Sequence, residues 1–113
     1  MKTRLLFVLL LFVSIAVVSV GAANNGGSEN ISIHGGSRGD VPFPHHAHQN
    51  RLKDCNTCHT DFPQEAGSIE TQKKAGKLKP KQVMNKQCVK CHRDQKKAGN
   101  PTGPTTCSKC HVK

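Results

Sequence analysis

All six cysteines of the chain, and three of its seven histidines, fall into three copies of one pattern, Cys-x-x-Cys-His. Two thiols on one helical turn can form thioether bonds to the two vinyl groups of a single porphyrin, while the following imidazole reaches the iron. The pattern therefore predicts three covalently attached c-type haems, each with a proximal histidine. The predicted haem-binding residues are Cys55, Cys58 and His59, then Cys88, Cys91 and His92, then Cys107, Cys110 and His111.

Six cysteines have two other common uses in a small chain. Three disulfides would suit a secreted protein, and paired Cys-x-x-Cys elements bind zinc with four protein ligands in a closed site. Neither use explains a histidine after every pair, and zinc would leave one of the three pairs without a partner. A thioredoxin-like redox motif would need a βαβ context that the sequence lacks.

The distal ligands come from a small set of residues, because an electron-carrying haem usually keeps its iron six-coordinate. His45 and His48 are three residues apart, so they share one face of a short helix and could reach two different haems. His46 points elsewhere, and we expect it to be exposed to solvent.

The third distal ligand is less certain from sequence. Met84 is the one methionine after the first residue, and it lies four residues before Cys88 in a chain poor in large apolar residues. We favour Met84 as an iron ligand over its alternative role as core filler. His34, otherwise a turn or surface residue, and His46 are the alternatives.

The N-terminus has the pattern of a secretory signal peptide. Two positive charges in residues 1–4 precede an apolar run over residues 5–20, and small residues follow at 20–23. We expect a cleaved leader over residues 1–22 and one haem-binding domain over residues 23–113. An uncleaved membrane anchor is the alternative, but the run is near the lower length limit for spanning a bilayer.

The predicted mature chain has no Trp or Tyr, so it would bury only a marginal core by itself. We expect a small, mostly irregular and helical fold with a short N-terminal β-hairpin, in which the haems form the core. The apoprotein would be largely disordered. The residues expected to pack on the haems are Phe43, Leu52, Phe62, Ile69, Leu78, Val83 and Val89.

Turn residues predict the N-terminal elements. The stretches 31–33 and 39–41 flank glycines and read as a two-stranded hairpin. Pro42 and Pro44 are expected to end the extended stretch, and residues 45–51 to form a short helix that leads into the first motif.

The remaining segments have weaker patterns. Residues 64–81 are lysine-rich without a clear period, and predict an exposed loop with short helical pieces. Residues 81–91 have helical character and carry the second motif, whereas glycines and prolines in 99–104 break the chain before the third motif.

The formal charge of +10 falls to +8 when Lys2 and Arg4 leave with the leader. Six propionates on three haems would reduce it to roughly +2. The remaining cations could guide an acidic partner or simply form a solvated face. A basic zinc module on nucleic acid would have the wrong compartment and lacks interleaved aromatics. The cations near the second and third motifs are Lys86, Lys90, Arg93, Lys96, Lys97, Lys109 and Lys113.

The segment Phe-Pro-His-His-Ala-His at 43–48, followed by three haem motifs, resembles the triheme cytochrome c7 family, a shortened relative of cytochrome c3. The resemblance covers nearly all of the predicted mature chain and implies a hairpin and a few helices around three close haems. It implies that His45 is the distal ligand of the first haem and His48 that of the second. The family's distal histidine for the third haem corresponds to Met84, and the loops between motifs look longer than is usual.

These features predict a monomeric, non-enzymatic electron carrier of the periplasm. The resemblance implies transfer from inner-membrane donors to periplasmic or outer-membrane acceptors in metal or sulfur respiration. Methionine ligation would raise the potential of the third haem above the other two. The alternative is a haem reductase or peroxidase, which would arise if the third iron kept an open position.

Overall fold

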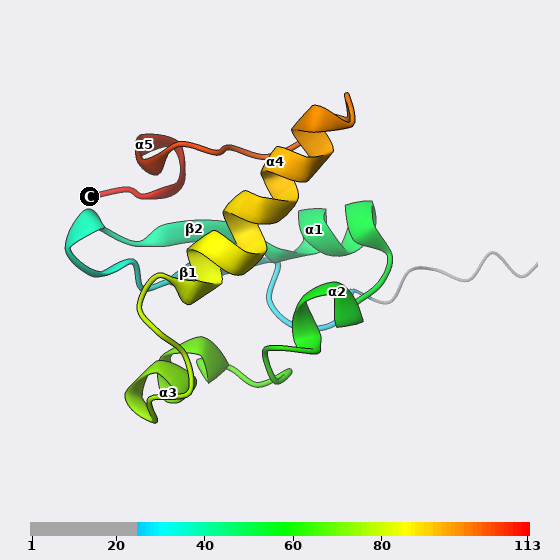
Figure 1. Cartoon of the computed structure of the whole chain (residues 1–113). Helices are drawn as coiled ribbons and strands as arrows, with labels where there is room; N and C mark the ends of the chain where they lie inside the picture. Colours follow the sequence, from blue (N-terminus) through cyan, green and yellow to red (C-terminus); the bar gives the residue numbers. More distant parts are fainter. Residues whose placement is uncertain (1–24) are drawn as a thin grey trace, which may run out of the picture.

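The computed structural model describes residues 25–113, so the predicted leader lies outside the described residues. A two-stranded hairpin is followed by short helices joined by long irregular segments (Figure 1). The elements are β1 (Asn30–Ile33), the 3₁₀ segment η1 (Gly36–Arg38), β2 (Val41–Pro44), α1 (His45–Leu52), α2 (Asn56–His59), α3 (Ser68–Lys74), the π-helical segment η2 (Val83–Cys88), α4 (Val89–Lys97) and α5 (Cys107–Cys110).

The hairpin confirms the expected N-terminal sheet, with β1 and β2 antiparallel and Ile31 opposite Phe43. The extended stretch ends at Pro44, as expected, but the expectation was wrong for Pro42, which lies inside β2. A proline cannot donate to a strand ladder but is tolerated where its nitrogen faces an unpaired edge. Residues two apart in a strand face the same side, so both prolines can turn their nitrogens away from β1.

The helix expected over residues 45–51 is α1, which starts directly after β2 and ends where Lys53 adopts a left-handed conformation (φ 62°). The expected lysine-rich loop contains one helical piece, α3. The helix expected over residues 81–91 begins with η2 and continues through α4 to Lys97. Each haem motif therefore lies on or beside a helical turn.

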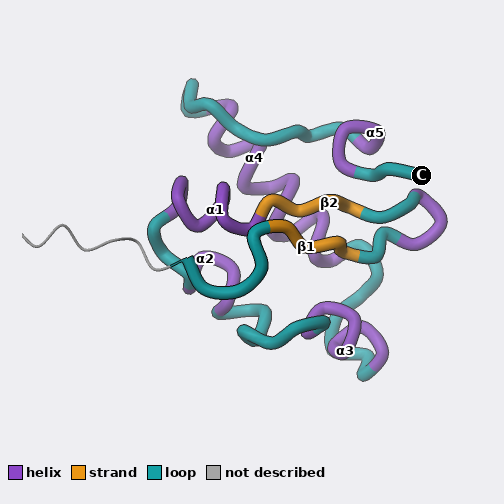
Figure 2. Tube along the Cα trace, turned by 180° about the vertical axis from the view of Figure 1, so that it is seen from behind, coloured by secondary structure: helices purple, strands orange, loops and turns teal. Residues whose placement is uncertain are grey.

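Two contacts distant in sequence fold the chain around the hairpin. The Val112 N–H donates to the Asp40 carbonyl at 2.9 Å, which brings the C-terminus beside the start of β2. The Lys73 Nζ of α3 donates to the His34 carbonyl at 3.2 Å. Viewed from behind, the hairpin therefore runs between the C-terminal segment with α5 on one side and α3 on the other (Figure 2).

The protein side chains make only a small core, in which Phe62 and Leu78 are the buried apolar residues of the described part. The other apolar residues expected to pack on haem, including Phe43 and Val89, are half-buried. Part of the apolar surface of these half-buried side chains is therefore still exposed, and a bound group could cover it. Within residues 25–113, no helix has the length and apolarity needed to cross a bilayer.

Candidate haem sites

The first histidine pair joins the start of α1 to the end of α2. The ring centres of His45 and His59 are 6.2 Å apart, with the ring planes at 85°. The family resemblance implied that these two residues bind the same haem, and the fold brings their rings together.

The second pair joins α1 to α4. The ring centres of His48 and His92 are 6.1 Å apart, with the ring planes at 28°. The eight-residue helix α1 thus carries two imidazoles, those of His45 and His48, and each lies beside the histidine of a different haem motif.

Both spacings fit a metal between the rings. A bond from a metal to an imidazole nitrogen is about 2 Å long, and a five-membered ring with bonds of about 1.33 Å has its centre about 1.1 Å from each vertex. Two imidazoles on opposite sides of one metal therefore have ring centres about 6 Å apart. The residues of both pairs fit axial ligation of a haem iron.

The ring nitrogens of the five expected histidine ligands share one bonding pattern. Each Nδ1 donates to a backbone carbonyl, which leaves Nε2 without a proton and free to bind a metal. The acceptors are the carbonyls of Ser28 for His45 (3.0 Å), Pro44 for His48 (2.9 Å), Phe62 for His59 (2.8 Å), Pro104 for His92 (2.7 Å) and Gly39 for His111 (2.9 Å).

The two remaining histidines do not follow this pattern. His46 uses Nε2, which bonds the Gly27 carbonyl at 3.1 Å. The expectation that His46 is solvent-exposed was wrong, because this contact holds the side chain half-buried against the N-terminal segment. His34 bonds the Asp40 carboxylate at 3.1 Å, and its side chain is 63% exposed. His46 therefore has its Nε2 occupied, whereas His34 leaves Nε2 free and differs from the five expected ligands in its carboxylate acceptor and its exposure.

Glycines lie against three of these imidazoles, a feature that the sequence analysis did not identify. A methyl group at Gly103 would stand 2.5 Å from His92 Cε1, and one at Gly27 would stand 3.3 Å from His45 Cε1. A methyl group at Gly35 would collide with the His111 ring. Gly103 was predicted only to break the chain, and no local pattern distinguishes a chain break from a close approach to a ring.

The third motif is held by the turn of the hairpin. His111 donates to the Gly39 carbonyl, and its neighbour Val112 pairs with Asp40. Among residues 25–113, no ring–ring contact involves His111, in contrast to the pairs on α1. The structure therefore places the proximal residue of this site but sets no imidazole opposite it.

Met84 lies in η2, one wide turn before Cys88, and is half-buried. The Val89 N–H donates to the Met84 carbonyl, five residues earlier, so the local turn is wider than an α-helical turn. Such π turns re-aim side chains and are frequent at functional sites.

Burial changes the pKa of three of the six thiols. It raises the pKa of Cys58, Cys88 and Cys110, and for Cys88 the nearby Cys58 and Cys110 thiols raise it further. All six cysteines are free thiols, as the formation of thioether bonds to haem requires. Within residues 25–113, no three His, Cys, Asp or Glu side chains converge as a metal site.

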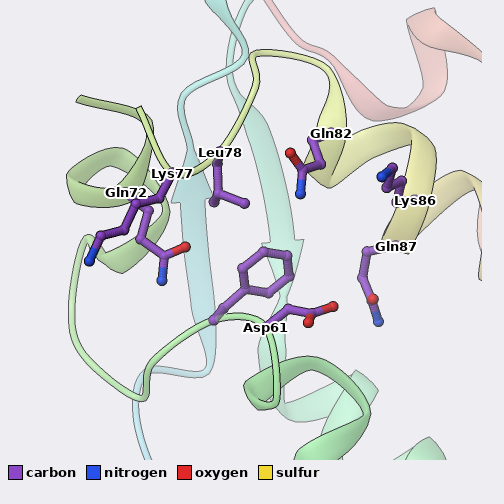
Figure 3. A pocket seen from close by; sticks show the side chains of 8 residues that line it. Asp61, Gln72, Lys77, Leu78, Gln82, Lys86 and Gln87 are labelled. Carbon is purple, nitrogen blue, oxygen red and sulfur yellow. The ribbon is translucent and has the colours of Figure 1, made fainter. Parts of the chain in front are cut away.

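A cavity of about 380 Å³ lies between α3 and η2, with Leu78 beside it (Figure 3). Gln87 joins one wall to the first motif, because its amide donates to the Thr57 carbonyl at 2.9 Å. The cavity has a small apolar floor and a polar rim. The lining residues are Asp61, Phe62, Gln72, Lys77, Leu78, Gln82, Lys86 and Gln87.

Comparison with known proteins shows which family this chain matches. The family model for cytochrome c7 and related cytochrome c matches residues 41–112. A cytochrome c7 of Geobacter metallireducens is 39% identical over 75 residues, which cover 66% of this chain and 67% of that protein.

Solved structures agree with the family match. The solution structure of triheme cytochrome PpcA from Geobacter sulfurreducens is similar, with a TM-score of 0.55 and 34% identity, over 76% of this chain and all of that one. Another structure of cytochrome c7 (PpcA) from the same organism gives a TM-score of 0.51 at the same identity and coverage.

Proposed function

Because the chain belongs to the cytochrome c7 family and has three covalently bound c-type haems, we propose that it is a periplasmic electron carrier with two bis-histidine haems and one histidine–methionine haem. The observation that carries the proposal is the pair of imidazole couples at 6.1 and 6.2 Å, each with both Nδ1 atoms bonded to carbonyls. Haem iron supplies one-electron chemistry when bound, and the two imidazole couples would hold two of the irons.

The ligand assignment follows the arrangement of the site. His45 and His59 would bind the first iron, and His48 and His92 the second. His111 would bind the third iron, with Met84 opposite it, because Met84 stands where the family has a histidine. The carbonyl-bonded Nδ1 atoms fix the orientation of each imidazole and strengthen its donation to iron. Closed axial positions favour electron transfer over binding of a small substrate.

The predicted leader supports export to the periplasm, where a carrier would take electrons from a membrane donor and pass them to periplasmic or outer-membrane acceptors, in metal or sulfur respiration. Exposed cations on and just before α4 support an acidic partner surface: Lys86, Lys90, Arg93 and Lys97 recur at helical spacing beside the second motif. Lys90 is partly neutralised by Asp94, which bonds it at 2.8 Å.

One experiment tests the ligand assignment. The protein, matured in a host that attaches haem and oxidised, should have low-spin haem absorption and a weak near-infrared methionine-to-iron band. The band should disappear in Met84→Ala but persist in His34→Ala. A holoprotein with only bis-histidine spectra would refute methionine ligation, and an intact mass that retains residues 1–22 would refute export with cleavage.

An open third iron is the second candidate, because no imidazole faces His111 in the described residues. The chain would then be a haem reductase or peroxidase. Carbon monoxide binding to one haem per molecule of the unmodified protein, without loss of a ligand, would favour this activity over the carrier.

A further inference from the structure

The residues Gly26–Glu29, here called the N-terminal strap, lie along α1 and are bonded to it at every carbonyl. The Glu29 carbonyl accepts from the His46 N–H at 3.1 Å and the Ser28 carbonyl from His45 Nδ1 at 3.0 Å. The Gly27 and Gly26 carbonyls accept from His46 Nε2 at 3.1 Å and Gln49 Nε2 at 2.8 Å. The strap continues β1, whose pairing begins at Asn30 opposite Pro44.

The two α1 ligands differ in where their Nδ1 acceptor comes from. His48 donates to the carbonyl of Pro44, four residues earlier, so its own helical turn orients it. His45 is the first residue of α1, and the residue four before it, Val41, lies in β2 opposite Ile33. No preceding helical turn can therefore supply a carbonyl to His45, and the strap supplies it instead.

Gly27 allows the strap to approach this ring. Its φ of +75° is a conformation that other residues rarely adopt, and a methyl group there would stand 3.3 Å from His45 Cε1. The carbonyls of Gly27 itself and of Ser28 hold consecutive imidazoles, those of His46 and His45. The strap therefore contacts the ring of His45 as well as its Nδ1.

We propose that the N-terminal strap is a positioning element for His45 that lowers the potential of the first haem. A carbonyl acceptor at Nδ1 raises the basicity of an imidazole and so favours ferric over ferrous iron. The inference rests on the proposed ligation of the first haem by His45. The strap, which precedes β1, would lower the potential of the first haem and leave the other two haems unchanged.

The test compares Gly27→Ala with Gly76→Ala in the complete holoprotein. Gly76 has nearly the same φ, +72°, but a methyl group there would meet no atom within 4 Å, so it matches the backbone strain without the ring contact. We expect Gly27→Ala to shift the ferric-over-ferrous preference of the first haem by threefold to tenfold, which raises its potential by about 28 to 59 mV. The second haem and Gly76→Ala should show no shift.

A second variant keeps the test independent of local strain. A chain whose mature part begins at Glu29 loses the Ser28 carbonyl and should raise the first potential in the same direction, with the Nδ1 proton of His45 exchanging faster with water by NMR. An unchanged first potential in both variants, or an equal shift of the second haem, would overturn the strap's role. His45→Ala separates the two proposals, because an unchanged low-spin first haem there would refute the ligation itself.

Discussion

The sites on α1 and the site at the hairpin turn are built in different ways. Helix α1 presents His45 to His59 and His48 to His92, so in the proposed assignment one short element would supply the distal ligands of two irons. The third site has its proximal residue, His111, anchored to the Gly39 carbonyl in the turn between β1 and β2. Its proposed distal residue comes from a different element, η2.

The difference shows how a chain with few apolar residues can hold closely spaced haems. Residues three apart on a helix point in similar but distinct directions, so one rigid helix fixes the relation between two haems. A third haem beyond the reach of that helix needs its own ligand, and a different ligand gives it a different potential. The proposed carrier therefore has two similar haems and one that is reduced more easily.

Replacing Met84 with histidine should remove this difference and is the largest change we predict. A second imidazole in place of the thioether would stabilise ferric iron, and axial ligands tune haem potentials over about 0.8 V in all. We expect the third potential to fall by on the order of 100 to 200 mV. A redox titration that follows each haem by NMR would measure it.

Met84→Leu is the matched control, because it keeps the volume near that of methionine but removes the ligand. It should produce a high-spin third haem that binds carbon monoxide, with the first two haems unchanged. If Met84→His and Met84→Leu both leave the third potential and spin state as they were, Met84 is not a ligand. The third haem would then not differ from the other two through a methionine ligand.

Gly103→Ala should disturb the second haem alone. The new methyl group would stand 2.5 Å from His92 Cε1, so the ring or the loop before α5 must move. Overpacking of this kind costs about 1 to 3 kcal/mol, which lowers the melting temperature of a domain this size by about 4 °C or more. Thermal unfolding of the holoprotein and the NMR shifts of the second haem would measure both effects.

Gly26→Ala serves as its control, because neither glycine has a positive φ and a methyl group at Gly26 would meet no atom within 4 Å. A fall in stability of the same size in both variants would mean that the loss at Gly103 is unrelated to His92. A shift of the first or third haem as large as that of the second would also contradict the assignment of His92.

The chemistry of the sites could be predicted from sequence because it resides in local spacing. The Cys-x-x-Cys-His motifs and the pair His45 and His48 each lie within one or two helical turns. The pairing of His48 with His92 is not local, and only the family resemblance implied it. The hairpin and α1 followed from turn residues and prolines, although the place of Pro42 and Pro44 inside β2 depended on which strand edge is unpaired.

The contacts that orient the ligands could not be predicted. The carbonyls that hold the five imidazoles come from Ser28, Pro44, Phe62, Pro104 and Gly39, and every residue has a carbonyl, so residue type gives no signal. His46 illustrates the same limit. Its position between two ligands predicted an exposed side chain, and the N-terminal strap, which has no periodic pattern, covers it.

The smallest effect we predict concerns the turn that anchors the third site. Hydrogen bonds from His34 and Ser32 hold the pKa of the Asp40 carboxyl below its usual range of about 3.8. A carboxylate with a lowered folded-state pKa stabilises the protein above the unfolded-state pKa, and this contribution is lost as the pH falls through the folded-state pKa. The stability that Asp40 adds should therefore be complete at pH 6 and decline progressively as the pH falls below about 3.8.

Asp40→Asn isolates this contribution, because the backbone carbonyl that accepts from Val112 remains. Since the Asp40 side chain is 54% exposed, solvent screens the interaction, and we expect the variant to melt only about 2 °C or less below the parent at pH 6. The difference should shrink progressively as the pH falls below about 3.8, whereas the effect of Gly103→Ala, which is steric, should persist. A difference that grows as the pH falls would show that the carboxylate of Asp40 does not stabilise this turn. The third site would then depend on two other bonds of the turn, from His111 Nδ1 to the Gly39 carbonyl and from the Val112 N–H to the Asp40 carbonyl.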